Sequence, residues 1–205
     1  AATVQMSLRL DKRNNIFEPS DGHFGSATLE YAGFYGDQKW LKASLEGRYY
    51  EPIYEELVFR SRVRAEQLMK TSDRALPRTE KFQLGGARNM RGYDFEDVGP
   101  KELLEDEISG EERLFNIGGQ FSLLTTLELE HPLIKEAGLK WVVFYDAGNV
   151  FETSLGDDFT LRQDYGFGFR WFSPIGVLRF EFGYPIDPEE GQDGQQFHFD
   201  IGQLF

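Results

Sequence analysis

The chain has 205 residues, enough for a sizeable core, and it carries 22 Lys and Arg against 35 Asp and Glu, a formal net charge of -13. This acidity argues against nucleic acid as a partner, because phosphate binding needs a cationic surface. The sequence has no cysteine, which excludes disulfides, thiolate metal sites and cysteine nucleophiles.

The three histidines also offer little chemistry. They are His23, His131 and His198, far apart and without a partner at the i, i+4 spacing of helical metal ligands. We therefore expect no metal site and no cofactor, and the sequence offers few residues for classical hydrolase chemistry. No run of eighteen apolar residues occurs, so the sequence predicts no transmembrane helix.

Period-two alternation begins near Val4 and continues along most of the chain, which predicts an all-β protein. The nine predicted strands are residues 4–11, 23–33, 39–51, 55–68, 118–131, 139–150, 163–173, 176–186 and 195–205. In the fourth of them, Arg60, Arg62 and Arg64 alternate with apolar or small residues and therefore share one face.

The fourth and fifth strands are separated by a connection from about residue 70 to 115, which shows no helical or strand periodicity. So long a loop within a compact domain is usually functional or disordered. Its acidic middle, KELLEDEISGEE, predicts an exposed and mobile segment. The preceding stretch, FQLGGARNMRGYDFEDVGP, is rich in glycine and holds the Arg-Gly-Tyr of Arg91, Gly92 and Tyr93.

The later strands place aromatic side chains on one face and charged or small ones on the other. Most segments have the roughly 9 to 11 residues that a tilted strand needs to cross a bilayer, and short turns alternate with longer connections. A water-soluble β-sandwich or lipocalin-like barrel also alternates. Its core would have to hold most of the 19 Phe and 9 Tyr, so the pattern favours a membrane barrel.

The last stretch, QFHFDIGQLF, ends in an aromatic residue and is typical of the C-terminal signal of bacterial outer-membrane barrels. Phe197, Phe199, Ile201 and Phe205 share its apolar face. Together with the glycine-rich loop, SLRLDKRNNIFEPSDG, HPLIKEAGLKWVVFYDAGNVF and RWFSPIGVLRFEFGYPID, it resembles the barrel of the BamA family of outer-membrane assembly factors. The wider superfamily includes TamA and the two-partner-secretion transporters.

This resemblance implies an antiparallel transmembrane β-barrel of sixteen strands, preceded by periplasmic POTRA domains. Residues 1–205 would supply its C-terminal strands, about nine of them, without a POTRA domain. It leaves open whether these strands close on themselves, pair with another chain or complete a larger barrel.

The resemblance further implies that the long loop folds back into the lumen. In the family the matching arginine, here Arg91, pairs with acidic residues on the following strands, which would be Glu128 and Asp146. Strand parity independently points both carboxylates inward. Gly85, Gly86 and Gly92 would let the loop turn tightly and approach the wall. The alternative is that Arg91 is an ordinary surface arginine.

A glycine near the end of the last strand, Gly202, weakens strand pairing and permits a kink. In the family a glycine at this place lets the final strand bend inward. The alternative is a small residue that faces the lumen.

The resemblance implies a protein that folds and inserts other outer-membrane β-barrels without covalent chemistry. Its partners would be outer-membrane lipids, unfolded barrel substrates and assembly-machinery lipoproteins. The alternatives are a TamA-like assembly factor, a two-partner-secretion transporter and, less in keeping with the sequence, an outer-membrane barrel enzyme.

Overall fold

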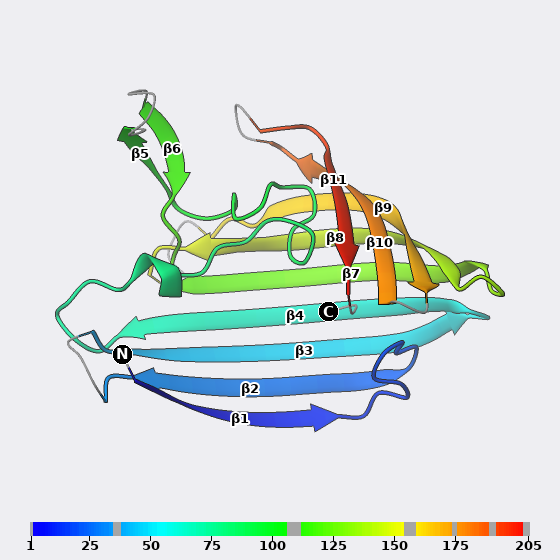
Figure 1. Cartoon of the computed structure of the whole chain (residues 1–205), viewed down its shortest axis with the longest axis horizontal. Helices are drawn as coiled ribbons and strands as arrows, with labels where there is room; N and C mark the ends of the chain where they lie inside the picture. Colours follow the sequence, from blue (N-terminus) through cyan, green and yellow to red (C-terminus); the bar gives the residue numbers. More distant parts are fainter. Residues whose placement is uncertain are drawn as a thin grey trace.

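The computed structural model describes residues 2–34, 38–105, 112–153, 159–173, 176–188 and 192–202 of the chain. Nine strands form one antiparallel sheet in the order β1-β2-β3-β4-β7-β8-β9-β10-β11 (Figure 1). The predicted all-β fold with nine main strands is confirmed. The strands are β1 (Thr3–Asp11), β2 (Gly22–Ala32), β3 (Trp40–Tyr54), β4 (Leu57–Lys70), β7 (Phe121–Ile134), β8 (Leu139–Phe151), β9 (Arg162–Ser173), β10 (Gly176–Ile186) and β11 (Gln196–Ile201).

The two faces of this sheet reverse the polarity of a water-soluble protein. On β9, Phe169 and Trp171 are 39% and 44% exposed, whereas Arg170 between them is 0% exposed. Apolar side chains such as Leu8 and Val63 are likewise exposed on the outer face, while charged residues are buried inside. Charges concentrate on the concave face, so we call that face the lumen and the convex, apolar face the lipid-facing surface.

Outward aromatic side chains on neighbouring strands stack across the sheet. The rings of Phe167 and Phe182 lie 5.4 Å apart, and those of Phe182 and Phe197 lie 4.9 Å apart. The cross-strand pairing of aromatic rings stabilises the register of β9, β10 and β11. Register is strongly specified here, because a slip of one residue would turn the whole apolar set toward the lumen.

The connections differ between the two ends of the strands. At one end two residues join β3 to β4 and four join β7 to β8, while ten join β1 to β2. At the other end, β4 and β7 are joined by the long loop of residues 71–120. Figure 1 shows this loop, in green, turning back over the concave side of the curved sheet. We call residues 82–100 the re-entrant loop.

One part of the long connection departs from the predicted irregular structure. It contains a hairpin of β5 (Lys101–Glu105) and β6 (Glu112–Asn116) and the short 3-10 turn η1 (Arg78–Glu80). Leu103 pairs with Leu114 in the hairpin. The expectation of an irregular connection was wrong for these residues, because two short segments can pair through their backbones without an alternating apolar pattern. Residues 106–111 of the acidic middle lie outside the described part of the chain.

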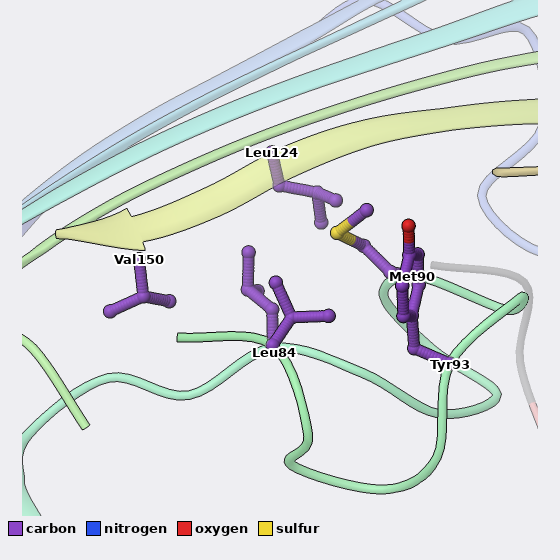
Figure 2. Packing of buried hydrophobic residues seen from close by; sticks show 6 residues of the cluster. Leu84, Met90, Tyr93, Leu124 and Val150 are labelled. Carbon is purple, nitrogen blue, oxygen red and sulfur yellow. The ribbon is translucent and has the colours of Figure 1, made fainter. Parts of the chain in front are cut away.

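Apolar packing holds the re-entrant loop against the sheet. Leu84, Met90 and Tyr93 of the loop form a buried cluster with Leu124 on β7 and Val150 on β8. Figure 2 shows Leu84 and Met90 beneath Leu124, so the loop carries its own apolar patch to the lumen wall. This burial contributes non-directional attachment of the loop to the wall, in addition to its charged contacts.

The sheet does not close within the described residues. Its order runs from β1 to β11, and these two strands do not pair with each other there. No helix in the described segments is long and apolar enough to cross a membrane.

A charge placed on the lipid-facing surface should be costly. Phe167→Arg is expected to destabilise the folded protein by about 2 to 4 kcal/mol if the residue lies near the bilayer midplane. Gln5→Arg, on the exposed luminal face of β1, serves as the control and should change stability little. Urea unfolding of the full-length protein in lipid vesicles measures both, and equal stability of the two variants would contradict the assignment of faces.

Candidate functional site in the lumen

The side chain of Arg91 is buried against three wall strands. Its Nε and Nη2 donate to the two oxygens of Asp146 on β8, at 2.8 and 2.9 Å. Its Nη1 donates to Glu128 on β7 at 2.6 Å and to Glu181 on β10 at 3.4 Å. The planar guanidinium therefore makes one bidentate pair and two further charge-assisted bonds, an arrangement that a lysine cannot reproduce.

The wall brings these carboxylates together because of strand parity. Thr126 lies opposite Asp146 in the β7–β8 register, and Glu128 is the next inward residue on β7. Glu181 reaches the same place from β10. Burial disfavours a charged guanidinium, but Asp146, Glu181 and Glu128 outweigh that cost and hold the pKa of Arg91 above its ordinary value.

Further arginines share the same carboxylates. Arg170 on β9 donates to Glu128 at 2.7 and 2.8 Å and to Glu181 at 2.8 and 3.0 Å. Such a buried set is stable only when every charge has partners, because an unpaired charge in the interior costs several kcal/mol. We call it the luminal ion cluster: Arg60, Arg91, Arg170 and Arg179 with Glu128, Glu130, Asp146 and Glu181.

An aromatic ring supports the guanidinium from one side. The Cζ atom of Arg91 lies 3.5 Å from the centroid of Phe144, which is a cation–π contact. Phe144 itself sits over Gly166, where an added Cβ would lie 2.3 Å from the ring. The glycine therefore makes the hollow that the ring fills.

The loop backbone also touches the wall directly. A Cβ on Gly183 of β10 would lie 2.1 Å from the carbonyl oxygen of Arg91, and a Cβ on Gly92 would lie 2.4 Å from the side-chain Cβ of Asp164 on β9. Both sites exclude a side chain, since real Cβ atoms do not approach so closely. The backbone of the Arg-Gly-Tyr motif thus packs directly against Gly183 of β10.

The other loop residues singled out from the sequence shape this turn. Gly85 and Gly86 have φ angles of 117° and 95°, in the region that favours glycine. Gly86 donates its backbone N–H toward the carbonyls of Met90 and Tyr93 at 3.0 and 3.1 Å. The hydroxyl of Tyr93 donates to the carbonyl of Gln163 on β9 at 3.0 Å.

Glu181 and Arg170 also meet at this site, although the sequence did not single them out as partners of Arg91. Strand parity places both on the charged face, while the choice of partner depends on the position of the loop. A cavity of about 300 Å³ beside Arg91 is lined by Arg62, Arg64 and Arg179 among others. Within the described segments, no three His, Asp or Glu side chains are grouped as metal ligands. The arrangement binds and positions a loop.

The terminal strand lies apart from the contacts of the Arg91 side chain. Phe197, Phe199 and Ile201 face outward and are half exposed. Gly202 follows the end of β11 with a φ of 157° and donates its N–H to the carbonyl of Val177 at 3.0 Å. Phe205 lies outside the described residues.

Comparison with protein families matches the Omp85 superfamily domain over residues 1–205. The chain belongs to the Omp85 superfamily. It is 31% identical over 213 residues to the outer membrane protein assembly factor BamA of Nitratidesulfovibrio vulgaris, covering 100% of this chain and 26% of that protein. Identity to BamA of Neorickettsia risticii is 28% over 212 residues, with coverage of 100% and 27%. The chain thus spans about a quarter of these relatives.

A solved structure supports the same fold. The crystal structure of BamA from Haemophilus ducreyi lacking POTRA domains 1-3 superposes with a TM-score of 0.84 at 22% identity, covering 99% of this chain and 42% of that one. The superfamily and this fold make the chain part of an integral outer-membrane β-barrel.

Removing the central cation should loosen the barrel. Arg91→Ala leaves three buried carboxylates without it, and loss of one partner from a buried pair costs about 3 to 5 kcal/mol. We expect the folded band of the full-length protein to unfold at a lower temperature on a semi-native gel, with Arg91→Lys intermediate. An unchanged unfolding temperature for Arg91→Ala, together with full complementation, would contradict the structural role of Arg91.

Replacing a single glycine of the wall with alanine tests the close contact between the loop and the wall. Gly183→Ala should displace the loop, because the new methyl group meets the carbonyl oxygen of Arg91. Gly47→Ala on β3 is the matched control, since a Cβ there meets nothing within 4 Å. Protease cleavage within the loop measures the displacement, and equal cleavage of both variants would refute the close approach.

Proposed function

We propose that this chain is the C-terminal barrel portion of an outer-membrane insertase, which helps other β-barrel proteins to fold and enter the membrane. The proposal depends on one combination: an inside-out antiparallel sheet whose lumen anchors a re-entrant Arg-Gly-Tyr loop. Relatives that match along the whole chain carry the name of an outer-membrane assembly factor.

In this proposal no covalent bond is made or broken, so the protein is not an enzyme. Its work is physical: the strands and the anchored loop shape the barrel, and an openable seam offers edge strands to an incoming chain. Outer-membrane lipids, unfolded barrel substrates and assembly-machinery lipoproteins are the proposed partners. The domain assignment of residues 1–205 to the end of a larger barrel belongs to the same proposal.

A two-partner-secretion transporter and a TamA-like assembly factor remain the alternatives within the superfamily. A barrel enzyme has less support from the described residues. The ring of His131 lies 6.0 Å from that of Trp141, on the outward face of β7, away from the luminal carboxylates. That position does not favour a role as a general base in the lumen.

Reconstitution tests the proposed activity. Full-length protein in liposomes should increase the rate at which a urea-denatured outer-membrane barrel acquires its folded, heat-modifiable form. Empty liposomes and liposomes with an unrelated barrel are the controls. Arg91→Ala should fold its client more slowly at equal amounts of inserted protein. A client that folds no faster than in the controls, or a protein that instead exports a soluble polypeptide, would overturn the proposal.

A further inference from the structure

The last strand of the sheet has few contacts of its own. β11 pairs with β10 over six residues, from Leu178↔Ile201 to Gly183↔Gln196. Within the described segments its other edge pairs with no strand. These six pairs are the fewest between any two neighbouring strands of the described sheet, so this junction has the least backbone hydrogen bonding to hold it.

The re-entrant loop contacts both β10 and β11 where these two strands pair. Arg88 donates through Nε and Nη2 to the two oxygens of Asp200, at 3.1 and 3.2 Å. His198 lies 2.8 Å from the carbonyl oxygen of Arg91, so its Nε2–H donates to the loop backbone. His198 and Asp200 both lie on the luminal face of β11, two positions apart.

β10 takes part in the same junction. Arg179 lies opposite Asp200 in the register, and its Nη2 donates to the carbonyl of Ala87 at 3.2 Å. Gly202, just after β11, lies beside Arg88: an added Cβ there would be 3.6 Å from Nη2 of Arg88, an ordinary van der Waals contact. A stretch of five loop residues therefore contacts both strands at their shared edge.

The two ends of this stretch differ in strength. The side chain of Arg91 is buried among carboxylates of β7, β8 and β10. The side chain of Arg88 is 69% exposed, and an exposed ion pair contributes little stability. The loop is thus anchored firmly to the middle of the wall and lightly to the last strand.

We propose that Arg88 to Arg91 form a clamp that holds β11 against β10 only while the loop is docked. Asp200 and His198 are the residues that the clamp grips. When Arg91 leaves the luminal ion cluster, β11 loses both contacts and separates from β10 more readily. This inference concerns the mechanics of the sheet and does not rest on the proposed insertase activity.

Amide hydrogen exchange of the full-length protein in lipid nanodiscs tests the clamp. Arg88→Ala should accelerate exchange in residues 196–201 by roughly two- to fivefold, as expected for loss of one exposed ion pair. The double variant Arg88→Ala with His198→Phe should accelerate it further. Exchange in β7 should stay at the wild-type rate. Arg13→Ala removes another bidentate Arg–Asp pair, to Asp11 at the far edge of the sheet, and is the control for loss of such a pair elsewhere.

A clamp differs from a local contact in that the docking of Arg91 should affect how firmly β11 is held by Arg88. In the part of the chain that the structure describes, the side chain of Arg91 pairs with β7, β8 and β10 and not with β11. Even so, Arg91→Lys should accelerate exchange in β11, and Arg88→Ala should add little in that background. Exchange in β11 that is the same in Arg88→Ala as in Arg13→Ala would overturn the clamp. So would full additivity of the two loop variants, or equal acceleration in every strand.

Discussion

The structure depends on one buried guanidinium. The side chain of Arg91 extends from the re-entrant loop into the lumen, where Asp146, Glu128 and Glu181 from three different strands neutralise its charge. Neither side is stable alone, since the carboxylates need a cation and the arginine needs acceptors. Their mutual requirement sets where the loop meets the wall.

Glycines make this docking possible. Gly183 presents bare backbone to the carbonyl of Arg91, and Gly166 opens the hollow for Phe144, which in turn lies against the guanidinium. Apolar packing by Leu84 and Met90 supplies non-directional attachment, while the ion pairs supply register. The same loop then reaches β11 through Arg88, so one segment joins the interior of the wall to its last strand.

Much of the fold could be predicted from the sequence, because period-two alternation is local and each membrane strand repeats it. Parity also placed Glu128 and Asp146 inward, and the structure has their carboxylates at Arg91. The hairpin around Leu103 was missed because its five-residue strands are short and do not alternate polar and apolar residues. The contact of Arg88 with Asp200 spans 112 residues and leaves no sequence pattern, so only the folded chain could bring it to light.

A distance measurement tests the central claim, that Arg91 holds the loop against the wall. Spin labels at Phe95→Cys, in the exposed part of the loop, and at Leu133→Cys, near the end of β7, can be placed on a cysteine-free background. Pulsed electron resonance of the full-length protein should give one narrow distance distribution, which broadens and shifts in Arg91→Ala. A distribution that stays narrow and unchanged in Arg91→Ala would contradict the account.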